Sequence, residues 1–111
     1  MSRVDSEFRN RVYDLVAQIP KGRVMTYGQI AALGGAAWAA WEVGQIAHTG
    51  PSGLPWQRVV NKQGGLAAGW PHGGRAAHKA ALEADGVKVS GEYLVIDMST
   101  VLWNPNHTSL L

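Results

Sequence analysis

Leu54-Pro55-Trp56-Gln57-Arg58-Val59-Val60 lies at the middle of a chain of 111 residues that contains no cysteine. The two residues at the centre of this stretch, Trp56 and Gln57, cannot carry nucleophilic chemistry. Indole is a poor nucleophile, and the amide of glutamine does not accept a proton at neutral pH. Without cysteine the chain can form no disulfide, no cysteine-ligated zinc site and no thiol catalyst. Covalent catalysis at this stretch is therefore excluded.

Upstream of the central stretch, the spacing of apolar residues predicts helices. The first runs from about Asp5 to Gln18. Thr26 is a plausible N-cap for a short second helix, which Gly34-Gly35 breaks. A third helix is expected at roughly Ala36 to His48. Two short helices joined by a glycine turn form a helix-turn-helix candidate, in which the later helix is the recognition helix.

Downstream, Arg58 to Ala67 predicts two short strands around a turn at Asn61 to Gly65. A helix follows from Arg75 to Asp85, and short late strands are expected over Val87 to Val89 and Tyr93 to Asp97. A hairpin after a helix-turn-helix indicates a winged arrangement. The predicted fold class is mostly α with a small β wing, a winged helix-turn-helix domain.

The composition fits one folded domain over residues 1–111. The chain is 46% hydrophobic and 16% charged, which is typical of a globular rather than a disordered protein. A chain of this length can bury one core. We expect the tail to be frayed from about Asn104.

The net charge hides an asymmetry along the chain. Residues 1–82 carry nine Lys/Arg and four Asp/Glu, residues 83–111 carry one Lys and four Asp/Glu, and the sum of +5 and −3 is +2. This distribution permits nucleic-acid binding without arguing strongly for it. The longest apolar stretch, Gly34 to Trp41, is too short to span a bilayer, and the N-terminus lacks a signal-peptide core. We expect a monomer in the cytoplasm, associated with the nucleoid when bound to DNA.

The third expected helix has two contrasting faces. The face expected to be buried carries Ala36, Ala39, Ala40, Val43, Ile46 and Ala47. The opposite face carries Trp38, Trp41, Glu42, Gln45 and His48. Outward tryptophans are unusual. They indicate a contact surface for bases or a partner, or else they pack on a neighbouring loop and cover the edge of the core; the sequence leaves both open.

A run of motifs surrounds the central stretch between about Phe8 and Gly86. They are Ile19-Pro20-Lys21-Gly22-Arg23-Val24, Thr26-Tyr27-Gly28-Gln29-Ile30-Ala31, Val43-Gly44 and Pro55 with Arg58, Val59 and Val60. Together they resemble the C-terminal DNA-binding domain of the O6-alkylguanine-DNA alkyltransferases. In that family the central stretch reads Pro-Cys-His-Arg-Val, and the cysteine accepts the alkyl group while the histidine helps to form its thiolate. Tryptophan is a common replacement for that cysteine in the alkyltransferase-like subgroup, which binds alkylated guanine and does not repair it.

The resemblance implies roles for residues at the start of the second helix. The counterpart of Tyr27 pushes on the phosphate of the target nucleotide so that the base rotates out of the stack, and the counterpart of Thr26 contacts the DNA backbone. The physics agrees, since an aromatic hydroxyl at a helix N-terminus lies beside free amide donors that favour phosphate. The structural alternative is that Tyr27 only covers the core.

The chain departs from the family on the recognition helix. The family inserts an arginine into the DNA at the position that Trp41 holds here. A tryptophan can stack, worth about 1–3 kcal/mol per base, so Trp41 either acts as an apolar wedge or marks the loss of base flipping. This helix has no Lys or Arg, and Glu42 would repel phosphate. Affinity for DNA must therefore come from other basic residues, and binding should be weak and steeply salt-dependent. The candidates are Arg23, Arg58, Lys62, Arg75 and Lys79.

The pocket departs as well. Asp85 aligns with the acid of the family's Cys-His-Glu relay, but no relay can form with Trp56 and Gln57. The subgroup carries a basic residue that probes the guanine face, and Gly69, next to Trp70, stands at the matching place. The glycine-rich segment Gly65 to Gly74 resembles the loop that frames the alkyl pocket, although such a segment can be only a connector.

Nothing in the sequence implies a metal or a cofactor. The histidines, His48, His72, His78 and His107, do not have metal-ligand spacing. There is also no phosphate loop or catalytic triad motif.

These observations lead to one hypothesis and its rivals. The resemblance implies a non-enzymatic protein that binds O6-alkylguanine in duplex DNA by base flipping and signals to nucleotide excision repair proteins. The residues expected to bind DNA are Thr26, Tyr27, Gln29, Trp38, Trp41, Gln45, Arg58 and Lys62. The residues expected to line the alkylguanine pocket are Tyr27, Pro55, Trp56, Val59, Gly69 and Trp70. The rivals are a degenerate DNA-binding or regulatory module without lesion preference, a protein-interaction domain that uses Trp38 and Trp41, and, as a remote alternative, an enzyme with another nucleophile.

Overall fold

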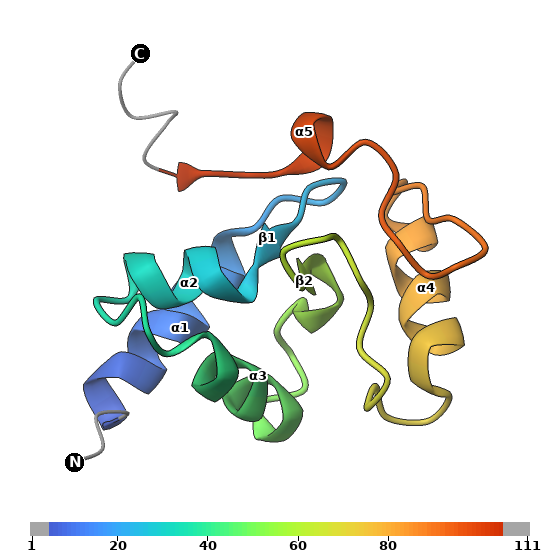
Figure 1. Cartoon of the computed structure of the whole chain (residues 1–111). Helices are drawn as coiled ribbons and strands as arrows, with labels where there is room; N and C mark the ends of the chain where they lie inside the picture. The colour runs from blue at the N-terminus through green and yellow to red at the C-terminus, as the bar shows by residue number, and fades with distance from the viewer. Residues whose placement is uncertain (1–4, 106–111) are drawn as a thin grey trace.

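Helices dominate the chain, and a very small sheet lies between them (Figure 1). The computed structural model describes residues 5–105. In order along the chain, the elements are α1 (Ser6–Gln18), β1 (Met25–Thr26), α2 (Tyr27–Leu33), α3 (Ala40–Thr49), the 3-10 turn η1 (Trp56–Arg58), β2 (Val59–Val60), α4 (Gly74–Ala84) and α5 (Met98–Val101). The predicted helix-rich fold with a helix-turn-helix is confirmed.

Side-chain caps begin the first two helices. The Asp5 carboxylate accepts a hydrogen bond from the amide of Phe8 at 2.9 Å, so α1 starts one residue later than predicted. Thr26 and Gln29 form a capping box at the start of α2, because the Thr26 hydroxyl accepts from the Gln29 amide at 3.0 Å and the Gln29 side chain accepts from the Thr26 amide at 2.9 Å. Such caps satisfy amides that a helix cannot pair internally.

Helix α3 begins at Ala40, four residues after the predicted start at Ala36. The segment before it forms a turn in which the Ala36 amide donates to Ala31 and the Ala39 amide donates to Ala36. The N-cap residue, Ala39, has no polar side chain that could accept hydrogen bonds from the first amides of the helix. Ala36, where the helix was predicted to begin, has none either. Trp38 therefore lies in the turn before α3, whereas Trp41 lies in its first turn.

The sheet consists of β1 and β2, which pair in parallel with Met25 opposite Val59 and Thr26 opposite Val60. The prediction of a hairpin over Arg58 to Ala67 is wrong, because β2 pairs with β1 and not with the segment that follows the turn. Val59 and Val60 are both buried, so β2 is covered on both faces and is not the half-exposed arm of a wing. A tight turn does follow, closed by a 3.1 Å hydrogen bond from the Asn61 amide to the Gly65 carbonyl.

The segment after that turn pairs with the C-terminal part of the chain. The Leu66 amide donates to the Tyr93 carbonyl, and the Val95 amide donates to the Gly64 carbonyl. Within the described residues, the predicted late strands are present only as isolated bridges, Gly65 with Leu94 and Val89 with Val95. The turn over 61–65 is thus held by residues far away in the sequence.

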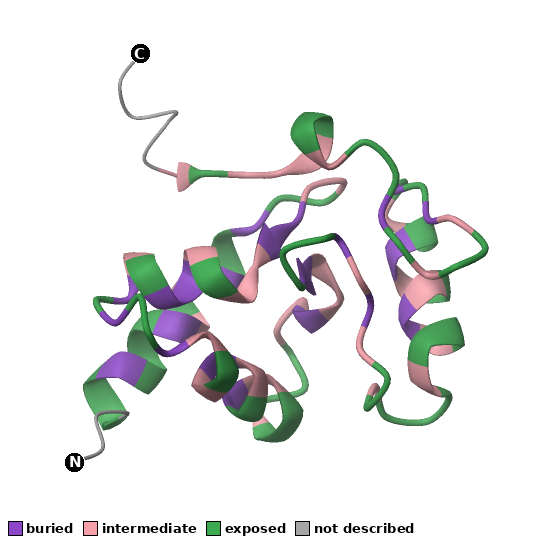
Figure 2. Ribbon diagram, in the orientation of Figure 1, coloured by how far each residue is buried: buried purple, intermediate pink, exposed green. Residues whose placement is uncertain are grey.

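Two hydrophobic clusters lie on either side of the sheet, as Figure 2 shows by the buried residues on facing helices. The larger cluster joins α1, α2, α3 and η1 and includes Phe8, Val12, Ile30, Val43, Ile46 and Trp56. The smaller cluster joins α4 to β2 and the C-terminal segment and includes Val60, Leu82, Val87 and Val95. The sheet therefore connects the helix-turn-helix to the part of the chain that carries α4.

The C-terminal segment returns to the sheet. Leu102 forms a parallel bridge with Val24, and the Trp103 amide donates to the Val24 carbonyl at 2.8 Å. The expected frayed tail falls largely on residues 106–111, which lie outside the described residues. Across residues 5–105, no helix has the length and apolar character needed to cross a membrane.

Candidate nucleic-acid interface

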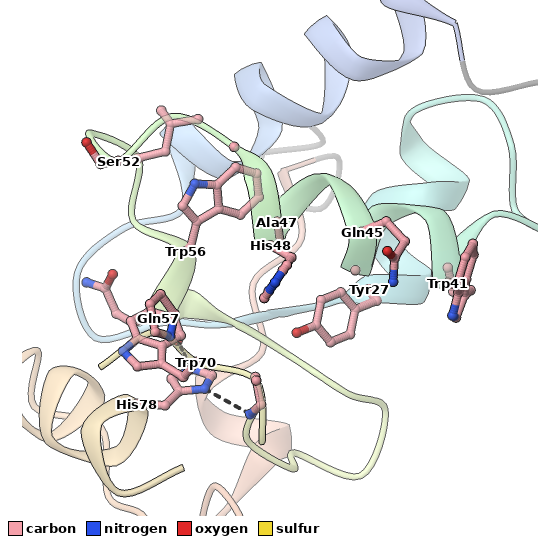
Figure 3. Close-up of a pocket in the computed structure, with 17 residues that line it drawn as sticks. Tyr27, Trp41, Gln45, Ala47, His48, Ser52, Trp56, Gln57, Trp70 and His78 are labelled. Atoms are coloured by element: carbon pink, nitrogen blue, oxygen red, sulfur yellow. Dashed lines mark hydrogen bonds between the residues drawn. The ribbon is translucent and has the colours of Figure 1, made fainter. Parts of the chain in front are cut away.

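A cavity of about 790 Å³ opens between α3, the start of α2, η1 and the loop before α4 (Figure 3). Aromatic side chains form much of its wall: Tyr27, Trp41, Trp56 and Trp70. Polar side chains lie between them: Gln45, His48, Ser52, Gln57 and His78. An apolar cavity with a few polar groups is the usual form of a small-molecule or base-binding site. The lining contains no Lys, Arg, Asp or Glu.

Tyr27 is the first residue of α2, so the capping box at Thr26 and Gln29 fixes where its ring lies. The ring lies against Gly44 of α3, since a methyl group at Gly44 would be 4.0 Å from Tyr27 Cε1. Burial raises the pKa of the Tyr27 phenol. The hydroxyl therefore stays neutral and can donate a hydrogen bond at the mouth of the cavity.

Trp56 forms a fixed wall. It is 9% exposed, and its Nε1 donates to the Pro51 carbonyl at 2.8 Å. Tyr13 of α1 packs edge-on against it with ring centroids 6.2 Å apart. Gly50 lies so close that a methyl group there would be 2.5 Å from Trp56 Cζ2. The indole is thus held by a hydrogen bond and by contacts from two elements.

The opposite wall is Trp70, which stacks on His78 of α4 with ring centroids 4.4 Å apart and an angle of 15°. The His78 Nδ1 accepts a hydrogen bond from the Ala67 amide at 3.0 Å, so Nε2 carries the proton and donates to the Gln57 carbonyl at 2.9 Å. Burial lowers the pKa of His78. A neutral, buried imidazole therefore ties the loop before α4 to η1 and supports Trp70 from behind.

Asp85, the predicted counterpart of the relay acid, is part of an ion pair with Arg58, and neither residue lines the cavity. Its carboxylate accepts from Arg58 Nε at 2.8 Å and from Gln57 Nε2 at 3.1 Å. The hydrogen bond from Arg58 is the main reason that the pKa of Asp85 is lowered, and burial opposes it. Arg58 Nη1 also donates to the Ile19 carbonyl at 2.9 Å. This network joins η1 to the end of α1 and to the end of α4.

Of the residues expected to line an alkylguanine pocket, four line the cavity: Tyr27, Trp56, Gly69 and Trp70. Pro55 and Val59 do not. Pro55 precedes η1, and Val59 is 1% exposed because it is the β2 residue that faces the larger cluster. A strand position cannot be assigned to one face when the partner strand is unknown.

The residues expected to contact DNA fall into four groups, of which Arg58 alone forms the last. Tyr27, Trp41 and Gln45 line the cavity, while Trp38 and Lys62 are exposed outside it. Thr26 and Gln29 are occupied by the capping box, and Gln29 Nε2 also donates to the Trp103 carbonyl at 2.9 Å.

Arg58 differs from the expectation, because each of its three guanidinium nitrogens donates within the protein, to Asp85 or to Ile19. Arg23 is similarly engaged with the carbonyls of Val101 and Leu102. An arginine whose donors are satisfied internally gains little by approaching a phosphate.

The sequence did not single out several lining residues as parts of a site. Ser52 and Gln57 come from a loop and a 3-10 turn, whose side-chain directions follow no regular period. His48 was placed on the outward face of its helix, which is correct, but its proximity to Gly69 depends on the folding of a distant loop. His78 carried no signal beyond its type. Within residues 5–105, no group of three metal-ligating side chains comes together.

Comparisons with known proteins agree with this geometry. Residues 7–87 match the family model described as 6-O-methylguanine DNA methyltransferase, DNA binding domain. The chain is 43% identical over 106 residues to a DNA base-flipping protein of Escherichia coli (strain K12), covering 94% of this chain and 79% of that protein. It is 37% identical over 105 residues to alkyltransferase-like protein 1 of Schizosaccharomyces pombe, covering 89% of this chain and 96% of that protein.

A solved structure also resembles the whole fold. It is S. pombe Atl1 in complex with damaged DNA containing O6-carboxymethylguanine, which superposes with a TM-score of 0.82 at 34% identity and covers 93% of this chain and 100% of that one. The Mycobacterium tuberculosis O6-methylguanine methyltransferase matches over a smaller part, with a TM-score of 0.63 at 33% identity, 75% of this chain and 50% of that one.

Proposed function

The chain belongs to the family of the 6-O-methylguanine DNA methyltransferase DNA-binding domain, and on this premise we propose that it recognises O6-alkylguanine in duplex DNA by rotating the damaged base into the cavity beside Trp56. It holds the base there and does not remove the alkyl group. The observation that carries this proposal is an open cavity of about 790 Å³ with aromatic walls at the end of the recognition helix, in a chain without cysteine.

The walls suit a flipped base. A base offers two flat faces and polar edges, and the cavity offers Trp56 and Trp70 as aromatic surfaces and Gln45, Ser52 and Gln57 as polar side chains in its lining. Extrusion of a base costs a few kcal/mol, which contacts in the pocket must offset. Stacking on aromatic side chains contributes about 1–3 kcal/mol per base. Two or three such contacts are enough to balance that cost.

Trp41 replaces the flipped base in the DNA stack under this proposal. It is 70% exposed in the first turn of α3 and lines the mouth of the cavity, so the indole can enter the duplex while the base occupies the pocket. Apolar wedges of this kind enter the minor groove between base steps and bend the DNA. Trp41 acts by stacking and offers the orphaned partner base little hydrogen bonding.

Affinity for undamaged DNA should be low. The cavity lining has no Lys or Arg, and Arg23 and Arg58 are engaged within the protein. Lys62, which follows β2, and Arg75, in the first turn of α4, are exposed. With about two to four phosphate contacts, the plot of log K against log salt should have a slope of about −2 to −4. The discrimination between damaged and undamaged DNA then depends on the cavity.

Trp56 and Gln57 can contact the damaged base, but they cannot take part in alkyl transfer. Indole and a neutral amide are poor nucleophiles, so neither Trp56 nor Gln57 accepts an alkyl group from the base. Trp56 Nε1 donates to the Pro51 carbonyl and Gln57 Nε2 donates to Asp85, and both contacts hold the side chains in place. A protein that binds a lesion without removing it needs another system for the removal. We therefore propose that the chain acts as a monomer in the cytoplasm, at the nucleoid, and presents the bound lesion to nucleotide excision repair proteins.

One experiment tests flipping and the absence of transfer together. A duplex carries a single O6-methylguanine with a fluorescent 2-aminopurine as its neighbour, excited where tryptophan does not absorb. Trp41 would itself stack on the 2-aminopurine and keep its emission low, so the readout is taken in Trp41→Ala, which leaves the vacated space empty. In that variant the proposal expects the emission to rise on binding, because the neighbour leaves the stack, and in the unmodified protein it expects a smaller rise with the O6-methylguanine recovered intact afterwards. Binding of Trp41→Ala without a rise in emission contradicts flipping, and loss of the methyl group from the base contradicts the absence of transfer.

A further inference from the structure

His48 is an unusual member of the cavity lining, because it is exposed and its imidazole has no hydrogen-bond partner among residues 5–105. It lies in the last turn of α3, and Figure 3 shows its ring pointing from that helix into the cavity between Tyr27 and Trp70. The ring lies against Gly69, since a methyl group at Gly69 would be 3.9 Å from His48 Nδ1. Both ring nitrogens therefore remain available for a ligand.

Apart from His48, the cavity lining contains two titratable side chains, Tyr27 and His78, and no Lys, Arg, Asp or Glu. From α2 it faces Tyr27, whose pKa is raised by burial. From α4 the cavity receives His78, whose pKa is lowered by burial and whose Nδ1 is held as an acceptor by the Ala67 amide. The loop over 50–55, η1 and the loop over 67–71 contribute neutral residues to the lining, with Ser52, Gln57 and Gly69 among them.

The position suits a positive charge. The carbonyl end of a helix carries partial negative charge and favours a cation in its last turn. The nearest acidic residue on the same helix, Glu42, lies six positions earlier and does not line the cavity. Imidazole is the side chain whose charge ordinarily changes between about pH 5 and 8. A protonated His48 would be the single positive charge that faces the cavity within the described chain.

We propose that His48 is a specificity-determining residue that selects O6-alkylguanines whose substituent ends in a carboxylate, and that this selection strengthens as the pH falls. The inference rests on the proposed function, because it needs the damaged base to enter the cavity. A carboxylate and a protonated imidazole form a charge-assisted hydrogen bond, which is roughly twice as strong as a neutral one. A neutral substituent gains less from the same change in pH, because only the carboxylate adds a second charge to the hydrogen bond.

The test compares three duplexes that differ at one base. The base is O6-carboxymethylguanine, O6-carbamoylmethylguanine or guanine, and the first two differ in charge and not in the number of heavy atoms. Dissociation constants are measured at about pH 5.5 and about pH 7.5 at constant ionic strength, a range in which a carboxylate stays ionised. The quantity of interest is the preference for carboxymethyl over carbamoylmethyl, because general effects of pH on DNA binding cancel in that ratio.

The inference expects the preference of the unmodified protein to rise about fivefold or more at the lower pH, which is about 1 kcal/mol. In His48→Gln the preference should not change with pH, and in His48→Lys it should be high at both values. His72→Asn is the matched control, because His72 is exposed, lies outside the lining and has a left-handed backbone that asparagine tolerates. That variant should keep the pH dependence of the unmodified protein.

Other outcomes separate the two proposals. If both lesions bind more tightly than guanine but their ratio does not change with pH, the role of His48 is overturned and the proposed function stands. If His48→Gln keeps the pH dependence, the role of His48 is likewise overturned. If neither lesion is preferred over guanine at either pH, both proposals are overturned. Thermal unfolding of each variant confirms that it is folded.

Discussion

Gly50 is the position at which the smallest change should disturb the cavity most. A methyl group at Gly50 would lie 2.5 Å from Trp56 Cζ2 and 2.9 Å from the Ile46 carbonyl oxygen, distances at which atoms must move. The backbone at Gly50 has φ −78° and ψ 175°, which alanine adopts without strain. Any loss of stability in Gly50→Ala therefore comes from displacement of the Trp56 indole and the end of α3.

The size of the effect follows from two opposing contributions. Forcing extra volume into a packed site costs about 1–3 kcal/mol, and replacing glycine by alanine restricts the unfolded chain and returns about 0.4–1 kcal/mol. Gly50→Ala should therefore destabilise the protein by about 1–2 kcal/mol, or lower Tm by about 4–8 °C for a domain of this size. Lesion affinity should fall as well, because Trp56 no longer stands where a base would stack.

The assay is thermal and urea unfolding of Gly50→Ala beside Gly53→Ala. Gly53 lies in the same loop, and a methyl group there would meet nothing within 4 Å. The control should be neutral or slightly more stable, with unchanged lesion affinity. The reasoning is refuted if the two variants have the same Tm, or if Gly50→Ala loses stability while its preference for damaged DNA is unchanged.

Three further predictions concern acid stability and the exposed tryptophans. His78 has a lowered pKa, so its contribution to stability is present above about its ordinary value of 6.5 and is lost as the pH falls toward the folded-state value; urea titrations should show this loss, smaller in His78→Gln. The lowered pKa of Asp85 adds stability that is present above pH 3.8 and is lost as the pH falls below it. Arg58→Ala should remove this contribution and cost about 1–3 kcal/mol of stability near neutral pH. Equal loss of stability in acid for Arg58→Ala and the unmodified protein would contradict the role of the ion pair. Trp41→Ala should weaken lesion binding by about 1–3 kcal/mol without a change in Tm, while Trp38→Ala, 61% exposed and outside the cavity, should leave it unchanged in the same binding titration.

Local signals in the sequence predicted local structure well. Asp5 and Thr26 are good N-cap residues, and they begin α1 and α2 because a cap needs only the next few amides. In α1 the apolar residues Phe8, Val12 and Val16 recur at helical spacing, and all three are buried. In these cases the residues that decide the structure are neighbours in the chain, so the sequence contains the whole argument.

Contacts between distant segments could not be predicted in the same way. Val59 and Val60 have the β-branched side chains of a strand, but nothing near them in sequence says that their partner is β1 rather than the segment after Gly65. The engagement of Arg58 with Asp85 and Ile19 also depends on the ends of two helices meeting. The wall formed by Trp70 requires His78 behind it, and that support exists only after the loop has folded onto α4.

The central claim is that the cavity distinguishes alkylated guanine from guanine. The most direct test is a titration of the protein against two duplexes that differ only by a single O6-methylguanine, at two salt concentrations. The account predicts tighter binding to the damaged duplex by about tenfold or more, which is about 1.4 kcal/mol, at both salt concentrations. Equal affinity for the two duplexes, falling together as salt rises, would contradict it and leave a DNA-binding domain without lesion recognition.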